Sequence, residues 1–185
     1  MIAGKNILLG VTGSIAAYQA VDLVGLLKRH LAEVRVILTR AASEFITPLS
    51  LETVSGYPVV VDMFSDKPHP TVEHIDLARG ADLLLIAPAT ANIIGKIANG
   101  IADDMLSTVV MATKAPILIA PAMNENMYKS PIVQANLKKL NDFGYHFVGP
   151  EYGEMACGGE GWGRLARLEV IVNAVIELLN EETEN

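Results

Sequence analysis

Hydrophobic and polar residues follow two alternating patterns along this chain. Short apolar runs, typical of strands covered on both faces, occupy 7–11, 33–39, 82–88, 116–121 and 145–150. Between these runs, apolar residues recur every three or four positions, as on one face of a helix. Strands that alternate with helices predict an α/β fold: a doubly wound, Rossmann-like parallel sheet with helices on both faces.

The clearest helical pattern is the set Ala17, Val21, Val24, Leu27 and Leu31. Further helices are predicted at 42–54, 92–100, 103–113, 130–144 and 165–181. Two long irregular stretches remain, at 62–74 and 149–164, and such loops are usually functional or disordered. Because there is no internal repeat or linker, we expect a single domain over 1–185, with a flexible loop at 149–164 and a solvated tail at 182–185.

Composition narrows the class of protein. Hydrophobic residues make up 51% and charged residues 19%, which predicts either a large interior or buried subunit contacts. No apolar run approaches the ~20 residues of a membrane-spanning helix, and the net charge of −7 argues against nucleic-acid binding. The single cysteine fits a reducing compartment. The N-terminal run has some features of a signal peptide, but Thr12, Gly13 and Ser14 interrupt it, so a first strand is favoured.

The first two strand ends suit an anionic ligand. In a doubly wound sheet, ligands bind at the carboxyl ends of the strands, near the reversal of strand order. The turn in GVTGSIAAY, with Gly13 and Ser14, offers backbone N–H groups to a phosphate, although a tight turn with Ser14 as a helix cap is an equal alternative. Thr39 and Arg40 stand where an NAD enzyme needs an acid, which disfavours NAD but allows NADP or a mononucleotide.

The next two strand ends carry small and amide side chains. In IAPATANIIGK, Thr90 or Asn92 can cap a helix, and the small residues also let a flat ring approach the backbone. In APAMNENM, which follows a buried strand, Asn124 lies between Met123 and Met127. A polar turn is expected at that place, so one amide between two thioethers needs an explanation.

The segment 151–165 holds the only cysteine, the only tryptophan and five of the fifteen glycines. A lone cysteine is usually a small buried hydrophobe, but the glycines beside Cys157 leave it little core to join, so a functional role is favoured. His74 ends a long loop before a short helix and is either structural or catalytic. Asp103 and Asp104 begin a helix and are predicted to cap it. The histidines and the cysteine lack the spacing of metal ligands, so no metal is expected.

The motifs GSIAAY, EHIDLAR, APATANIIGKIANGIADDMLST, APAMNENM and ACGGEGWGRL resemble, in order, those of the flavin-dependent cysteine decarboxylases. They are most similar to the branch that serves coenzyme A biosynthesis, and the similarity runs from about residue 5 to 165. The resemblance implies FMN as cofactor. It also implies which residues contact FMN: Gly13, Ser14, Ile15 and Thr39 near the phosphate, and Thr90, Ala91, Asn92 and Ala122 near the ribityl chain and ring.

The same resemblance implies decarboxylation of 4′-phosphopantothenoylcysteine to 4′-phosphopantetheine. The substrate thiol is oxidised to a thioaldehyde, CO2 is lost, and the ene-thiol is reduced again. His74 and Asn124 match catalytic positions, Asn124 and Met127 match substrate contacts, and Cys157 matches the proton donor, on a loop that covers the substrate. The family implies a homotrimer or a multiple of it, with His74 reaching a neighbour's flavin, and a cytoplasmic location.

Two positions depart from the family pattern: Tyr128 replaces a common tryptophan and Leu165 a common methionine. Neither change removes a catalytic group. Because the chain ends soon after these motifs, the ligase that makes the substrate is expected to be a separate protein. Three alternatives stay open: a decarboxylase of a peptide's C-terminal cysteine, an NADP-dependent reductase that uses Arg40, and a non-catalytic flavin-binding regulatory subunit.

Overall fold

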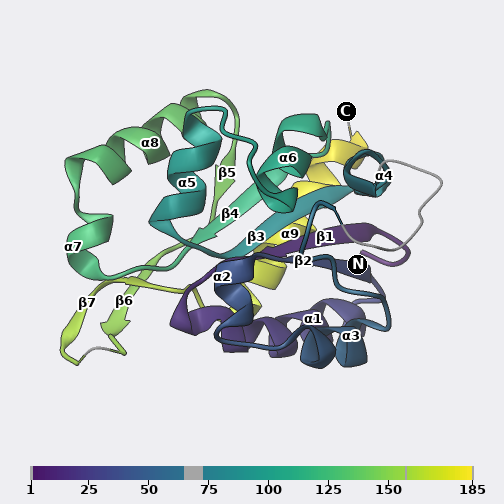
Figure 1. Cartoon of the computed structure of the whole chain (residues 1–185), viewed down its shortest axis with the longest axis horizontal. Coiled ribbons are helices and arrows are strands. Elements are labelled where there is room, and N and C mark those ends of the chain that lie inside the picture. Colours follow the sequence, from purple (N-terminus) through teal and green to yellow (C-terminus); the bar gives the residue numbers. More distant parts are fainter. Residues whose placement is uncertain (1, 65–72, 157, 185) are drawn as a thin grey trace.

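A five-stranded parallel sheet forms the centre of the molecule, in the strand order β2-β1-β3-β4-β5 (Figure 1). The computed structural model describes residues 2–64, 73–156 and 158–184. The strands of this sheet are β1 (Asn6–Val11), β2 (Glu33–Leu38), β3 (Leu83–Ala89), β4 (Ile117–Pro121) and β5 (His146–Phe147). The chain crosses from β2 over β1 to β3, so the order reverses between β1 and β3. The predicted doubly wound parallel sheet is therefore confirmed.

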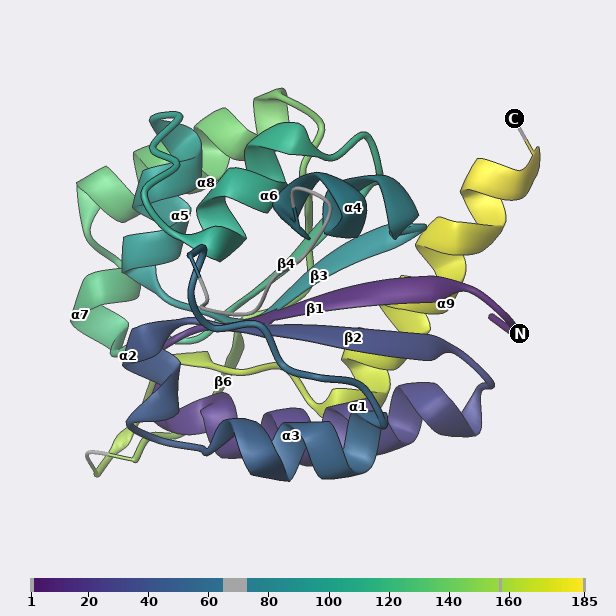
Figure 2. The same cartoon turned by 45° about the vertical axis from the view of Figure 1, so that its right-hand side comes forward.

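Helices cover both faces of the sheet (Figure 2). One face carries α1 (Ala20–Arg29), α3 (Pro48–Ser55) and α9 (Leu168–Glu184), and the other carries α4 (Glu73–Gly80), α5 (Ala91–Ala98), α6 (Met105–Ala112) and α8 (Pro131–Asp142). Three short helical turns lie at strand ends: η1 (Ile15–Gln19), α2 (Arg40–Ser43) and α7 (Glu125–Tyr128). A two-stranded antiparallel hairpin, β6 (Glu151–Glu154) and β7 (Glu160–Arg164), extends beyond the sheet.

The apolar runs of the strands build two cores, one on each face. In β1, Ile7 and Leu9 pack with α1, α3 and α9, whereas Leu8 between them packs with α4, α5 and α6. All seven residues of β3 are buried. Alternate side chains of a central strand thus enter different cores, which is why its sequence is apolar without interruption.

Some predicted boundaries differ from the structure for local reasons. The helix expected at 42–54 is two helices, because Thr47 caps α3 and Pro48 occupies its first turn. Leu31 does not belong to the buried face of α1; it lies past the helix end at φ 64° and is 63% exposed. The stretch 149–164, predicted to be irregular, contains the β6–β7 hairpin instead. Of the stretch 62–74, residues 65–72 lie outside the described part of the chain.

None of the helices described in the structure is both long and apolar enough to cross a membrane.

Candidate functional site

The carboxyl ends of β1 and β3 are joined by the buried side chain of Thr12. Its hydroxyl donates to the Pro88 carbonyl oxygen at 2.6 Å and accepts from the Thr90 backbone N–H at 3.0 Å. Thr90 in turn caps α5, where its Oγ1 accepts from the Ile93 N–H at 3.4 Å. The strand ends at the reversal of strand order are therefore held by side-chain hydrogen bonds in addition to the sheet.

The Gly13–Ser14 turn begins the next wall of the site. A Cβ on Gly13 would lie 2.6 Å from the Cβ of Ala41, so only glycine allows this approach to α2. The Ser14 hydroxyl accepts from the Ala16 N–H at 3.3 Å and caps η1, and Thr39 caps α2. Ser14 therefore caps a helix, as considered from the sequence. The Gly13–Ser14 turn lies at the edge of two cavities.

The first cavity, called here the sheet-end cavity, has a volume of about 760 Å3. It lies where β1, β2 and β3 end, and four residues predicted to bind the cofactor line it: Gly13, Thr39, Thr90 and Asn92. Lys96, Asp103, Asp104, Met127 and Arg40 also line it. The Arg40 Nε donates to Asp62 Oδ1 at 2.6 Å, so a second phosphate at this guanidinium would compete with a carboxylate.

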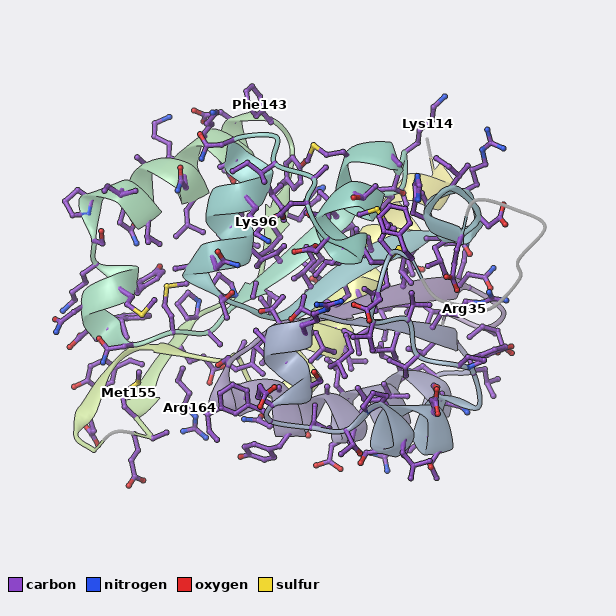
Figure 3. All side chains as sticks on the ribbon, viewed as in Figure 1. Arg35, Lys96, Lys114, Phe143, Met155 and Arg164 are labelled. Carbon is purple, nitrogen blue, oxygen red and sulfur yellow. The ribbon has the colours of Figure 1, made fainter. Side chains whose placement is uncertain are left out.

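An ion cluster forms part of the sheet-end cavity. Lys96 Nζ lies 2.6 Å from Asp103 Oδ1 and 2.7 Å from Asp104 Oδ2 (Lys96 is labelled in Figure 3). Asp104 also caps α6 in a reciprocal arrangement with Ser107, which confirms its predicted role. Burial raises the pKa of Asp104, but hydrogen bonds from Lys96 and Ser107 outweigh it and lower the pKa below its usual value. Lys96 was not singled out from the sequence, where it appears as one cation on an amphipathic helix.

The second cavity, called here the hairpin cavity, has a volume of about 580 Å3. One wall is η1 with Ser14, Ile15 and Tyr18, a second follows β4, and the third is the β6–β7 hairpin. The β4 wall contains Ala122, Met123 and Asn124, and the hairpin wall contains Met155, Ala156, Gly163 and Arg164. The Gly13–Ile15 turn thus separates the two cavities.

The hairpin contacts the loop after β4 at two places. The Met123 N–H donates to the Gly163 carbonyl oxygen at 2.9 Å. Gly163 has φ 122°, and a Cβ there would overlap the carbonyl oxygen of Met123. Nearer the tip, Glu125 Oε1 accepts from the Trp162 N–H at 3.3 Å. These contacts place the hairpin beside Asn124.

Asn124 itself begins α7, where its Oδ1 accepts from the Asn126 N–H at 2.9 Å. Because a helical turn follows, the two methionines that flank it in the sequence separate. Met123 is buried and lines the hairpin cavity, whereas Met127 is 48% exposed and lines the sheet-end cavity. The two methionines therefore do not form one wall around Asn124.

Three other predicted site residues lie elsewhere. His74 is in the first turn of α4 rather than before it, and it lines neither cavity; Figures 1 and 2 show α4 well away from α7 and the hairpin. Ala91 begins α5 and also lines neither cavity. Cys157 lies outside the described residues. In the described ranges, no group of three or more His, Cys, Asp or Glu residues could hold a metal ion.

The chain is similar in sequence and in fold to known proteins. The chain is 44% identical over 179 residues to the coenzyme A biosynthesis bifunctional protein CoaBC of Haemophilus influenzae, which covers 97% of this chain and 45% of that protein. The chain therefore spans less than half the length of this curated relative.

Two solved structures share the whole fold. A PPC decarboxylase mutant complexed with pantothenoylaminoethenethiol superposes with a TM-score of 0.86 at 32% identity, covering 96% of this chain and 99% of that one. The FMN-dependent cysteine decarboxylase SpaF gives a TM-score of 0.82 at 34% identity, with the same coverage. The family model described as Flavoprotein matches residues 1–180. The chain belongs to the flavoprotein family.

Proposed function

We propose that the chain binds FMN and decarboxylates 4′-phosphopantothenoylcysteine to 4′-phosphopantetheine. The observation that carries this proposal is the pair of cavities on either side of the Gly13–Ile15 turn. The sheet-end cavity is lined by Gly13, Thr39, Thr90 and Asn92 of the predicted cofactor site. The hairpin cavity is lined by Ser14, Ile15 and Ala122 of that site, together with Asn124 and the hairpin. The names of the similar proteins, a PPC decarboxylase and an FMN-dependent cysteine decarboxylase, support the same reaction.

The sheet-end cavity fits FMN in size and chemistry. Its volume of about 760 Å3 is in the usual range for small-molecule sites. Thr39 and Thr90 offer hydroxyl groups at the strand ends, and Asn92 offers an amide. In this proposal Gly13, Ser14 and Ile15 hold the phosphate, and Thr90, Ala91, Asn92 and Ala122 lie along the ribityl chain and ring. Gly13 lines the sheet-end cavity, whereas Ser14, Ile15 and Ala122 line the hairpin cavity. In this proposal the ligand therefore extends into both cavities.

When bound, FMN supplies the reversible two-electron oxidation that makes loss of CO2 from a cysteine possible. The protein orients the substrate and supplies a proton to it. The Asn124 amide holds the substrate carboxylate, and Met127 gives an adaptable apolar contact. An imidazole nitrogen of His74 accepts a proton. The Cys157 Sγ donates a proton, and the hairpin segment excludes water while it does so.

This assignment requires a second subunit. His74 lines neither cavity of its own chain, so its proposed role implies the flavin of a neighbouring subunit. A homotrimer or a multiple of it is the assembly that the family resemblance implies. Large apolar side chains that remain exposed, such as Phe45 at 47% and Leu49 at 69%, are consistent with buried subunit contacts. A cytoplasmic location also remains a prediction.

The first test is the colour and the released cofactor of the purified protein. We expect a yellow protein that releases FMN, and CO2 production from 4′-phosphopantothenoylcysteine. A colourless protein that binds only NADPH would support the reductase alternative. A yellow but inert protein would support the regulatory subunit, and turnover of peptides with a C-terminal cysteine would support the peptide decarboxylase.

Asn124→Asp tests the assignment of the substrate site. The change keeps the size of the side chain but sets a negative charge against the substrate carboxylate and removes an amide donor. Substrate binding is expected to fail while the flavin absorbance is unchanged. Normal turnover by this variant would mean that Asn124 serves only as the cap of α7.

A further inference from the structure

Two arginines line the two cavities, and their surroundings differ. Arg40 in the sheet-end cavity is paired with Asp62 at 2.6 Å. Arg164 lines the hairpin cavity, and no ion pair or hydrogen bond engages its guanidinium within the ranges that the structure describes. An unpaired guanidinium in the same cavity as Asn124 is available to an anionic ligand.

The backbone fixes where Arg164 starts. It is the last residue of β7 and follows Gly163, whose carbonyl oxygen accepts from the Met123 N–H at 2.9 Å. Its side chain crosses Gly153 on the facing strand: a Cβ there would lie 3.1 Å from Nη1 and 3.2 Å from Cδ of Arg164. The missing side chain of Gly153 therefore leaves the space that the arginine occupies. Figure 3 shows Arg164 projecting from the base of the hairpin on the side of η1.

The other lining groups of the hairpin cavity suit an amide-containing chain. Tyr18, Gln19 and Asn124 offer hydroxyl and amide groups, and Ile15, Met123, Met155 and Leu165 offer apolar surface. Among the described residues Arg164 is the one basic side chain of this cavity, and Glu154 is the one acidic side chain. The pantothenoyl arm of the proposed substrate has two amides, a hydroxyl and two methyl groups, and it carries an anion at each end.

We propose that Arg164 binds the terminal phosphate of the substrate and thereby selects phosphorylated over unphosphorylated pantothenoylcysteine. The protein carries a net charge of −7, so a local cation favours the binding of a doubly charged phosphate. A guanidinium can give it two parallel hydrogen bonds. The carboxylate at the other end of the arm has its own partner in Asn124. This inference rests on the proposed function and adds a specificity-determining residue to it.

The test compares wild type, Arg164→Gln and Arg164→Lys as FMN-loaded proteins. For each, kcat/KM is measured with 4′-phosphopantothenoylcysteine and with pantothenoylcysteine, and FMN content is measured by absorbance. Arg164→Gln is expected to lower the preference for the phosphorylated substrate by roughly ten- to a hundredfold, mostly through KM. Arg164→Lys should keep part of the preference, because it keeps the charge but loses the paired hydrogen bonds.

Arg167→Gln is the matched control. Arg167 is an exposed arginine three residues further on, it pairs with Glu151 at 3.4 Å, and it does not line the hairpin cavity. This variant should keep the wild-type preference. Equal loss on both substrates in Arg164→Gln would overturn the proposal and assign the arginine to the carboxylate end. Loss of FMN would overturn it in favour of the cofactor phosphate, and an unchanged kcat/KM for both substrates would show that the arginine does not bind the substrate.

A binding measurement separates this inference from the proposed function. Isothermal titration with 4′-phosphopantothenate and with pantothenate needs no turnover. If wild type decarboxylates neither substrate, the proposed reaction is wrong, but tighter binding of the phosphorylated compound that disappears in Arg164→Gln still supports the inference. Equal binding of the two compounds by wild type rejects it.

Discussion

The two cavities are held together in different ways. The sheet-end cavity is made from strand ends and helix starts of the main fold, joined by the buried Thr12 hydroxyl and by the cluster around Lys96. The hairpin cavity has one wall outside the sheet, and that wall contacts the loop after β4 through Gly163 and Glu125. The first cavity therefore shares its interactions with the core, whereas the second depends on a few local contacts.

This difference predicts different costs for mutation. A change that loosens the sheet-end cavity should lower the stability of the whole domain, because the same groups close the sheet. A change that moves the hairpin should leave the domain folded and flavin-bound but impair the substrate reaction. The following substitutions test that contrast.

Gly163→Ala should have the largest effect, and on turnover rather than on folding. An alanine at φ 122° is strained, and its Cβ would overlap the Met123 carbonyl oxygen, so the hairpin must move away. We expect decarboxylation to fall by about a hundredfold, as displacements of about 1 Å in active sites do, while flavin absorbance is retained. Gly25→Ala is the control: its Cβ enters open space within α1, and it should stabilise the domain by about 0.5–1 kcal/mol. Wild-type turnover by Gly163→Ala would show that the hairpin position does not matter.

Thr12→Val should destabilise the fold itself. Valine keeps the shape but leaves the Pro88 carbonyl and the Thr90 N–H without their side-chain partner in a site that is 2% exposed. The expected loss is about 2–3 kcal/mol of unfolding free energy, measured by urea denaturation, with weaker flavin binding. Thr53→Val removes a hydroxyl that also donates to a carbonyl, that of Leu49, but on an exposed helix surface, and it should cost less than about 0.5 kcal/mol. Equal losses would contradict the role of Thr12 as a buried link.

Lys96→Met should give a smaller, pH-dependent loss. Folding lowers the pKa of Asp104. The Asp104 carboxylate therefore contributes fully to the free energy of unfolding above its unfolded pKa of about 3.9, and this contribution is lost as the pH falls through the lower folded pKa. The folded state raises the pKa of Lys96, so its contribution is lost only at high pH. We expect the free energy of unfolding to fall by about 1–2 kcal/mol at pH 7, a value between those typical of exposed and of buried ion pairs.

Acid titration checks this prediction. The stability difference between wild type and Lys96→Met should shrink as pH falls below the folded pKa of Asp104. Lys138→Met, which removes an exposed pair with Asp142 at 2.7 Å, should cost less than about 0.5 kcal/mol. A Lys96→Met cost that does not change with pH would show that apolar contacts of the lysine, not its charge, are lost.

Glu125→Gln should have the smallest effect. The half-buried Glu125 carboxylate accepts from the Trp162 N–H and pairs with Lys129 at 2.8 Å, so the change weakens one of the two hairpin contacts. We expect KM to rise about two- to fivefold with no measurable change in melting temperature. Lys129→Met removes the ion pair but keeps the Trp162 contact and should leave KM close to wild type. If both variants raise KM equally, the ion pair rather than the hairpin contact is responsible.

The sequence predicted the sheet well, for a physical reason. Strands such as β3 are buried on both faces, so their apolar runs are continuous and their ends are marked by proline, glycine or a capping residue. The caps Ser14, Thr90 and Asp104 could be identified because the chemistry of capping is local.

The hairpin could not be predicted, because its buried positions carry no side chains. In β7 burial alternates as in a half-covered strand, but the buried residues are Gly161 and Gly163, which a hydropathy pattern does not register. Thr12 and Lys96 were missed because their partners lie on other elements, 76 and 8 residues away in the case of Pro88 and Asp104. Met123 and Met127 were expected to form one wall around Asn124, because the sequence pattern does not show the four-residue helical turn α7 that separates them.

The hairpin segment also leaves and rejoins the fold at one point. A Cβ on Gly149 would lie 2.9 Å from the Cβ of Ala166, so the residues that flank 150–165 touch each other. A chain that closes on itself in this way can change in length and composition at little loop-closure cost, because that cost grows only slowly with length. A change in the length of the segment between Gly149 and Ala166 should therefore leave the sheet intact.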